Sequence, residues 1–248
     1  MPEATSEEKL RKRLTTRFWK AVATYHLIDE GDKILVGLSG GKDSLFLLEM
    51  LASRMNVAPK HYSVAALHVR MENISYKSDT SYLQDFCKSR GVELHLRTTS
   101  FDASTDTRRS PCFLCSWYRR KELFNLAQEL GCNKIALGHH QDDIIHTALM
   151  NTFFVGNFST MPARLQMRKM PLTVIRPLCM ETEEDIKEYA LLKGFQKQEK
   201  LCPFEHDSHR DAMRRLFQQI EKISPEARQS IWKALNNAGK MEEISKGT

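Results

Sequence analysis

Leu38-Ser39-Gly40-Gly41-Lys42-Asp43-Ser44 joins a short apolar run to a predicted helix, and it is the most informative stretch of this sequence. Its two glycines allow the backbone to turn sharply and to approach a ligand closely. The amide groups at the start of the helix form, together with the helix dipole, a site for an anion. Lys42 adds a positive charge, and the hydroxyl groups of Ser39 and Ser44 are hydrogen-bond donors. The stretch therefore predicts a phosphate-binding turn.

The spacing within this turn excludes a Walker A loop, which has four residues between its first glycine and Gly-Lys. A glycine-rich turn with an exposed lysine and no ligand is the plain alternative. The hexapeptide Ser39–Ser44 resembles the PP-loop of ATP pyrophosphatases. That resemblance implies an enzyme that cleaves ATP between its α- and β-phosphates and holds pyrophosphate in this loop.

Short apolar runs alternate with helical patterns along the chain. Strands are predicted at 33–38, 63–69, 92–98, 134–137 and 172–175. Helices are predicted at 6–28, 44–55, 81–90, 112–130, 142–154, 183–193 and 210–223, and a last helix is predicted to start at Ser224-Pro225 with serine as its N-cap. This alternation predicts an α/β fold with a doubly wound, mostly parallel sheet, which the PP-loop resemblance makes adenine nucleotide α-hydrolase-like. A ligand in such a sheet lies beyond the carboxyl ends of the strands.

The chain is predicted to have three parts. They are a basic N-terminal helix at 1–30, a PP-loop α/β catalytic domain at 31–200 and a C-terminal helical region at 201–248. The stretch 156–170 is irregular and basic, and it is predicted to be a mobile loop.

Composition and charge favour an anionic partner. The 248 residues carry a net charge of +6, and no apolar run approaches the roughly 20 residues that cross a bilayer. The first twenty residues contain no apolar stretch suited to a secretory signal, so a cytoplasmic protein without membrane contact is expected. Basic residues form three clusters, which would attract a polyanion or would simply be solvated helix faces. These clusters are Lys9, Arg11, Lys12, Arg13, Arg17 and Lys20; Arg108, Arg109, Arg119, Arg120 and Lys121; and Arg210, Arg214 and Arg215.

A second motif, Gly138-His139-His140-Gln141-Asp142-Asp143, follows the strand predicted at 134–137. Its place after a strand puts it at the same cleft as the phosphate-binding turn. Two acids at the start of a helix would also be explained by their favourable interaction with the helix dipole alone. PP-loop enzymes that modify tRNA have a similar segment here, and the resemblance implies that Asp143 acts on the substrate while Asp142 orients neighbouring groups or Mg²⁺.

Three of the six cysteines suggest a metal site. Cys112 and Cys115 form a C-x-x-C pair at the start of a helix, where both sulfurs lie on one side and the dipole favours thiolate. The pair alone fits a zinc half-site, a redox pair or half of an iron–sulfur site. Cys202 is the third candidate, and a fourth ligand from His206 or His209 would make a zinc site instead. The other cysteines are predicted to be small buried apolar residues: Cys87, Cys132 and Cys179.

In combination these motifs resemble the tRNA 2-thiocytidine synthetase family of PP-loop sulfurtransferases. The resemblance rests on Leu38–Ser44, Cys112–Cys115, Arg119-Arg120, Ala136–Ile144 and Val174–Leu178, in this order. It implies thiolation of a cytidine in the tRNA anticodon loop, with a [4Fe–4S] cluster on Cys112, Cys115 and Cys202, ATP and Mg²⁺. Free sulfide or a cysteine desulfurase system as sulfur donor, and a homodimer, are expected from the family.

The resemblance also implies roles for individual residues. The catalytic residues would be Lys42, Asp43 and Asp143. The ATP-binding residues would be Ser39, Gly40, Gly41, Lys42, Asp43, Ser44, Leu67, Gly138 and Asp142. The RNA-binding residues would be Arg11, Lys12, Arg13, Arg108, Arg109, Arg119 and Arg120.

The chain departs from the family pattern at one position, because Glu205 stands where bacterial members have a second cysteine three residues after the third one. It also lacks the cysteine-rich zinc ribbons of the 2-thiouridine relatives, which favours the cytidine branch. Three other functions fit parts of the pattern. They are amidation of an adenylated base, as in lysidine synthetases, thiolation or desulfuration of a small molecule, and non-catalytic redox sensing by a nucleotide-binding module.

Overall fold

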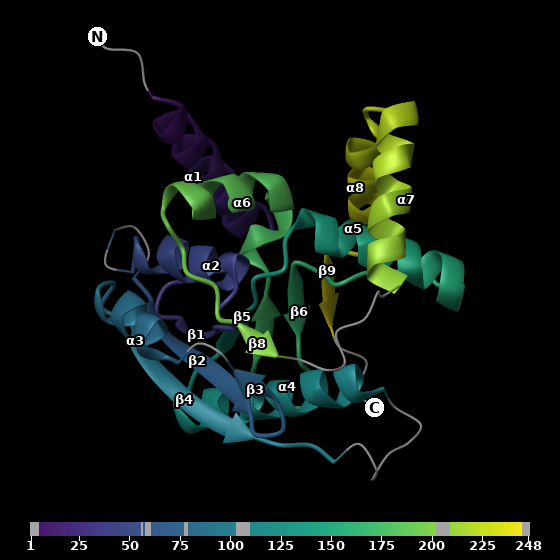
Figure 1. Cartoon of the computed structure of the whole chain (residues 1–248). Helices are drawn as coiled ribbons and strands as arrows, with labels where there is room; N and C mark the ends of the chain where they lie inside the picture. Colours follow the sequence, from purple (N-terminus) through teal and green to yellow (C-terminus); the bar gives the residue numbers. More distant parts are fainter. Residues whose placement is uncertain are drawn as a thin grey trace.

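A seven-stranded, mostly parallel sheet with helices on both faces forms the body of the chain (Figure 1). The computed structural model describes residues 5–55, 57, 61–76, 79–102, 110–201 and 209–244. The strand order across the sheet is β4-β2-β1-β5-β7-β6-β9, and a separate two-stranded sheet pairs β3 with β8. The fold class predicted from the sequence is confirmed.

The strands are short, as is usual for a sheet of this kind. Their bounds are β1 Lys33–Gly37, β2 Ser63–Met71, β3 Ser75–Tyr76, β4 Glu93–Thr99, β5 Lys134–Ala136, β6 Arg164–Gln166, β7 Thr173–Ile175, β8 Lys200–Leu201 and β9 Glu242–Ile244. The helices are α1 Ser6–Thr24, α2 Lys42–Ala52, α3 Ser81–Lys88, α4 Pro111–Glu129, α5 Gln141–Met150, α6 Glu183–Leu192, α7 His209–Ile223 and α8 Ala227–Asn237. A π-helical turn, η1 Asn151–Val155, continues α5, and a 3₁₀ turn, η2 Pro177–Met180, follows β7.

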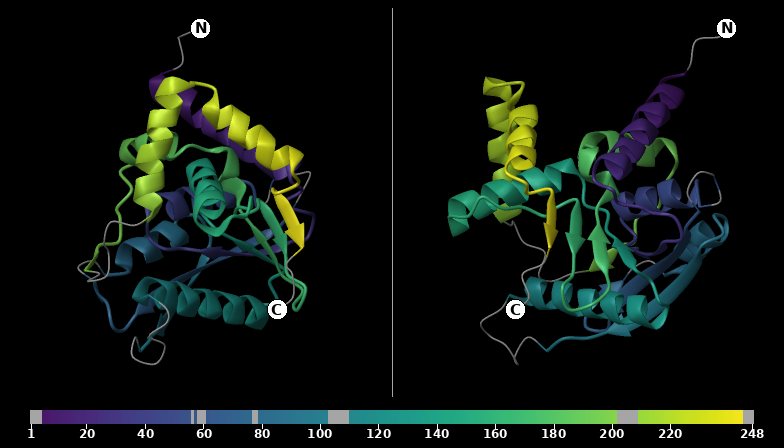
Figure 2. Two further views of the ribbon diagram at one scale, coloured as in Figure 1. Left: turned by 90° about the vertical axis from the view of Figure 1, so that its right-hand side faces the viewer. Right: turned by 180° about the vertical axis from the view of Figure 1, so that it is seen from behind.

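Two apolar layers enclose the sheet, and the central strand β1 contributes to both. Ile34 and Val36 pack into the larger layer, which is formed with residues of α1, α2 and α6. Leu35 points the other way and packs with Leu123 of α4. A run that is apolar at every position is typical of a parallel strand covered on both faces. Figure 2 shows α4 on one face of the sheet and α1, α2 and α6 on the other.

The sheet reverses its winding between β1 and β5. β1 pairs in parallel with β2 on one edge and with β5 on the other, so the loops that follow β1 and β5 leave the sheet side by side. A Cβ atom on Gly138, in the loop after β5, would lie 3.1 Å from the carbonyl carbon of Asp43 and 3.1 Å from the amide nitrogen of Ser44. Glycine at this position therefore lets the two loops touch at the place where such sheets bind ligands.

Three expectations from the sequence are wrong. The stretch 156–170 contains a strand, β6, which pairs with β7 on one edge and β9 on the other. Ser224 is not an N-cap, because its amide still donates to the carbonyl of Ile220 at 2.8 Å and α8 begins only after a turn. Cys132 is partly exposed, whereas Cys87 and Cys179 are buried as expected. The division into three parts stays a prediction, although residues of α1, α2 and α8 share one apolar layer.

Substitution of Gly138 by alanine tests the contact between the two loops. The added methyl group meets backbone atoms that have no freedom to move, so Gly138→Ala is expected to lower the free energy of unfolding by about 1–3 kcal/mol. Gly37→Ala is the matched control, because its Cβ would also come within 3.1 Å of a neighbour, but that neighbour is the flexible end of Leu137. Urea titrations measure both variants, and equal losses would contradict this account.

Candidate functional site

The phosphate-binding turn between β1 and α2 is held by its own hydroxyl groups. The Ser39 and Ser44 Oγ atoms lie 3.1 Å apart, and Ser44 Oγ also donates to the carbonyl of Gly41 at 2.9 Å. Gly40 has a φ of 81°, and its carbonyl accepts a hydrogen bond of 3.0 Å from the backbone amide of Gln198. A Cβ atom on Gly40 would overlap the Gln198 side chain, so glycine is required here for both conformation and space.

Lys42 lies on one side of this turn, beside two acids. Its Nζ atom is 3.1 Å from Asp43 Oδ2 and 3.2 Å from Glu183 Oε1. Burial alone would lower the pKa of Lys42, but the two carboxylates outweigh it and raise that pKa. Lys42 therefore stays protonated, and it lines a cavity of about 320 Å³ together with Phe195 and Lys197.

The two acids at the start of α5 are both engaged. Asp142 Oδ2 accepts from the Glu183 amide at 2.8 Å, and Asp142 Oδ1 is 2.8 Å from Arg228 Nη1. Asp143 Oδ2 accepts from the His140 amide at 3.2 Å, and the His140 ring accepts from the Asp143 amide at 3.4 Å, so the two residues cap the helix reciprocally. Asp142 thus connects the start of α6 with α8, and Asp143 is held where α5 begins.

Three arginines of the C-terminal helices neutralise acids of the site. Arg210 of α7 is 3.3 Å from Asp143 Oδ1, and Arg228 of α8 pairs with Asp142. Arg214 of α7 is 3.3 Å from Glu183 Oε2, the same side chain that contacts Lys42. The sequence singled out Arg210 and Arg214 only as a basic cluster. It gave no signal for Arg228 or Glu183, because only the fold brings them to the site.

The C-x-x-C pair opens onto a second, larger cavity. Ser110 Oγ caps α4 by accepting from the Phe113 amide at 3.2 Å, and Pro111 occupies the first turn. Cys112 is exposed and Cys115 is partly exposed. The cavity has a volume of about 580 Å³ and is shared by the first part of the phosphate-binding turn, β2, the loop after β5 and α4. Its lining includes Ser39, Leu67, Cys112, Cys115, Ser116, Arg119, Arg120, His139, Arg176 and Arg210.

The structure therefore places Ser39 and the C-x-x-C pair around one space, here called the thiol cavity. The predicted ATP-binding residue Leu67 lines it too, and its carbonyl accepts from the Leu38 amide at 2.9 Å. Lys42 does not line it. Among the described residues, its lining contains four arginines and no carboxylate, so the thiol cavity is suited to an anion. Sequence reasoning quoted the motifs that contain His139 and Arg176 but assigned neither residue to the site.

Two of the three predicted metal ligands lie at the thiol cavity. Cys112 and Cys115 lie one turn apart at the amino end of α4, where the helix dipole favours thiolate, and both line the thiol cavity. These two residues fit one half of a cluster site. Cys202 lies outside the described residues, as do Glu205 and His206. Within the part of the chain that is described, no three His, Cys, Asp or Glu side chains are grouped so as to hold a metal ion.

The predicted RNA-binding residues fall on two faces. Arg119 and Arg120 line the thiol cavity from α4, and Arg119 Nη2 donates to the Tyr76 hydroxyl at 2.9 Å. Arg11, Lys12 and Arg13 are exposed on α1, across the sheet from α4 (Figure 2), and Arg13 is 2.6 Å from Asp185. The structure therefore does not bring these two groups together. Arg108 and Arg109 lie outside the described residues.

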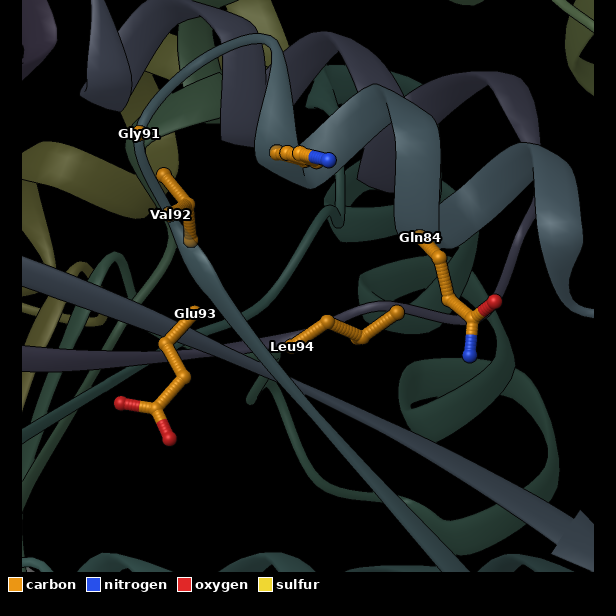
Figure 3. Close-up of a pocket in the computed structure, with 6 residues that line it drawn as sticks. Gln84, Gly91, Val92, Glu93 and Leu94 are labelled. Atoms are coloured by element: carbon orange, nitrogen blue, oxygen red, sulfur yellow. The ribbon is translucent and has the colours of Figure 1, made fainter.

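Another hollow, of about 530 Å³, lies between α3 and the start of β4 (Figure 3). Gln84 and Leu94 line it, together with the turn from Gly91 to Glu93. It is at the amino end of an edge strand, whereas ligands in sheets of this type bind at the carboxyl ends. It is therefore not a candidate for the functional site.

In the described ranges, no helix has the length and apolar character needed to cross a membrane.

The sheet, the turn and the loop contact together define a PP-loop protein. The family described as "PP-loop domain" matches residues 6–220. The U34-tRNA thiolase NcsA from Methanococcus maripaludis, solved with its [4Fe-4S] cluster, is similar in fold, with a TM-score of 0.76. The two are 24% identical, and the match covers 94% of this chain and 79% of that one.

Sequence relatives narrow the family. The tRNA-cytidine(32) 2-sulfurtransferase of Pelobacter propionicus is 39% identical over 93% of this chain and 87% of its own length. The protein of the same name from Geotalea uraniireducens is 35% identical over 94% of both. The chain belongs to this family of PP-loop proteins, the tRNA-cytidine(32) 2-sulfurtransferases. The resemblance found in the sequence is confirmed.

The ion pair between Arg228 and Asp142 predicts a pH-dependent contribution to stability. Burial raises the pKa of Asp142, but Arg228 and the Glu183 amide outweigh it, so that pKa lies below its ordinary value. A lowered carboxyl pKa stabilises the fold above the ordinary value, and this stabilisation is lost as the pH falls through the lowered one. Arg228→Ala is therefore expected to lower the free energy of unfolding by about 1–3 kcal/mol at pH 7 and by much less below about pH 3.

Lys233→Ala is the control for this experiment, because it removes an exposed cation from the same helix. It is expected to leave stability almost unchanged at either pH. Urea titrations at the two pH values provide the measurement. A deficit in Arg228→Ala that stayed constant with pH, or that matched Lys233→Ala, would contradict the assignment.

Proposed function

We propose that this chain is an ATP-dependent tRNA sulfurtransferase that replaces the carbonyl oxygen of cytidine 32 by sulfur. One observation carries this proposal. Ser39 of the phosphate-binding turn and the cysteines of the C-x-x-C pair line the same cavity, so a base activated at the turn meets thiol-held sulfur without leaving the site. The names of the sequence relatives support tRNA and cytidine as the substrate.

The reaction needs two steps, because the carbonyl oxygen of a base is a poor leaving group. In the first, that oxygen attacks the α-phosphorus of ATP, the bond to the β-phosphate oxygen breaks, and pyrophosphate leaves. In the second, a sulfur nucleophile forms a C–S bond, the C–O bond breaks, and the electron pair leaves with AMP. Two accessible barriers replace one prohibitive displacement. A [4Fe–4S] cluster on Cys112, Cys115 and Cys202 would supply the sulfur chemistry.

Residues of the turn act in the first step. Lys42 is kept protonated by Asp43 and Glu183, and with the amides of the turn it stabilises negative charge that grows on pyrophosphate. The buried Oδ1 atom of Asp43 has no hydrogen-bond partner among the described residues. A carboxylate oxygen beside a phosphate site is a ligand that Mg²⁺ prefers, so Asp43 would hold a Mg²⁺ ion that offsets phosphate charge there. Asp143, held by His140 and Arg210, lies in the first turn of α5, directly after the loop that touches this turn.

The tRNA would approach from the side of α4. Arg119 and Arg120 line the thiol cavity and are placed to contact the RNA backbone, and Arg108 and Arg109 precede the same helix. A base in a single-stranded loop can be splayed into a cavity, which fits position 32 in the anticodon loop. A cytoplasmic location follows from this substrate. The role of the α1 residues in RNA binding, the sulfur donor and the homodimer stay predictions.

Nucleoside analysis tests the substrate. In a strain without this gene, mass spectrometry of digested tRNA is expected to show loss of 2-thiocytidine. The wild-type gene is expected to restore it, whereas Lys42→Ala and Cys115→Ala are not. Persistence of every thiolated nucleoside in the deletion strain would reject tRNA as the substrate.

Two variants distinguish the residues that activate the base with ATP from those that supply sulfur. Lys42→Ala is expected to abolish pyrophosphate release and to keep the broad absorbance near about 400 nm that an anaerobically purified cluster protein shows. Cys112→Ala is expected to lose that absorbance and to keep ATP binding. Cys132→Ala is the control, since this partly exposed cysteine packs near α4 outside the lining of the thiol cavity and should retain both properties. Colourless wild-type protein with stoichiometric zinc would exclude the cluster and favour amidation of an adenylated base.

A further inference from the structure

Arg176 is a buried cation in the wall of the thiol cavity. It directly follows β7, and only 7% of its surface is exposed. Its Nη1 atom donates to the carbonyl of Pro162 at 2.5 Å, and its Nε atom donates to His139 Nδ1 at 3.3 Å. Neither partner carries a negative charge. Among the described residues, no Asp or Glu side chain forms an ion pair with Arg176, and Asp143 attracts it only without direct contact.

A buried cation that no carboxylate contacts is costly, so its position in the wall of a cavity favours an anionic ligand there. Burial lowers the pKa of Arg176 to about 10, which leaves the guanidinium positive at neutral pH. The other charged residues that line the cavity are also cations: Arg119, Arg120 and Arg210. Arg210 is paired with Asp143, whereas Arg119, Arg120 and Arg176 have no such pair among the described residues, so these three arginines offer positive charge to a phosphate-type anion.

His139 adds a neutral donor to this site. Burial and the adjacent Arg176 lower the pKa of His139 to about 4, so the imidazole is uncharged at neutral pH. Because its Nδ1 atom accepts from Arg176, the single ring proton lies on Nε2. Arg176 and His139 thus present a planar cationic fork and an N–H group from adjacent positions, which suits the oxygens of a phosphoryl group.

The two phosphate products of the proposed reaction need separate partners. Lys42 and Asp43 line the smaller cavity, and neither is in the lining of the thiol cavity. Charge on pyrophosphate is therefore met at Lys42. The phosphate that remains attached to the base must be met by a different cation, on the side where the cysteines lie.

We propose that Arg176, with His139, binds the α-phosphoryl group that links adenosine to the activated base in the thiol cavity. This inference rests on the proposed function and identifies the residues that receive its AMP leaving group. When the C–S bond forms and the C–O bond breaks, the departing electron pair places additional negative charge on that phosphate. A fixed guanidinium and an N–H donor stabilise this charge without having to reorganise.

Binding of the two product anions tests the assignment. Isothermal titration of the full-length holoprotein with AMP and, separately, with pyrophosphate gives both affinities. Arg176→Met is expected to weaken AMP binding at least tenfold and to change pyrophosphate binding less than twofold. Lys42→Ala is expected to show the reverse. Arg97→Met, which removes an arginine that is paired with Glu122 and Glu129 away from the cavity, is the matched control and should bind AMP like the wild type.

Stability measurements distinguish ligand binding from a structural role. AMP is expected to raise the thermal midpoint of the wild type and not that of Arg176→Met. Arg176→Met removes a buried charge but also the hydrogen bonds to the Pro162 carbonyl and His139, so the ligand-free midpoint is expected to change little. If Arg176→Met does not fold, Arg176→Lys and His139→Gln are expected to fold and to weaken AMP binding about three- to tenfold, because each loses part of the donor set.

Three outcomes would overturn the inference. The first is wild-type AMP affinity in the Arg176 variants while the wild type still thiolates tRNA, which leaves the proposed function intact. The second is an equal loss of AMP and pyrophosphate binding together with a lowered midpoint, which would make Arg176 purely structural. The third is a wild type that binds neither anion and thiolates no tRNA, in which case the proposed function fails as well.

Discussion

The closeness of two backbone segments governs the whole site. Gly138 lies against the backbone of Asp43 and Ser44, which is possible only without a side chain. This contact sets the phosphate-binding turn and the start of α5 at a fixed distance, because both leave neighbouring strands of one sheet. The acids of α5, the capping by His140 and the opening of the thiol cavity all take their positions from this junction.

The regions around Lys42 and around the cysteines differ in their charged side chains. On the side of Lys42, cations and carboxylates alternate, with Asp43, Glu183 and Arg214 in contact with one another or with Lys42. On the side of the cysteines, the part of the lining that the structure describes holds arginines and no carboxylate. Such a division suits a reaction that makes two anions in sequence, because each product meets its own electrostatic environment. Asp142 belongs to neither cavity lining, and its contacts with Arg228 and the Glu183 amide are those of an organising residue.

Local sequence patterns were sufficient to predict the central strands of the sheet but not the strands at its edge. β1 and its turn were predictable, because a run that is apolar at every position followed by Gly40-Gly41 has few other interpretations. β6 was not, since three residues with one apolar side chain become a strand only through pairing with β7 and β9. The C-x-x-C pair could be recognised from its spacing. The cavity that it lines could not be predicted, because residues from several distant segments form it. Arg228 reaches Asp142 across a long sequence separation that no local pattern encodes.

The arginines of α7 and α8 have a consequence for how the chain matures. Asp142 and Asp143 emerge from the ribosome before the arginines that neutralise them, since Arg210 and Arg228 come later in the sequence. Until those helices dock, partly buried carboxylates face each other beside the turn, and their mutual repulsion opposes closure. Neutralisation of the acids at the start of α5 therefore depends on residues that are synthesised later, when α7 and α8 pack against α5.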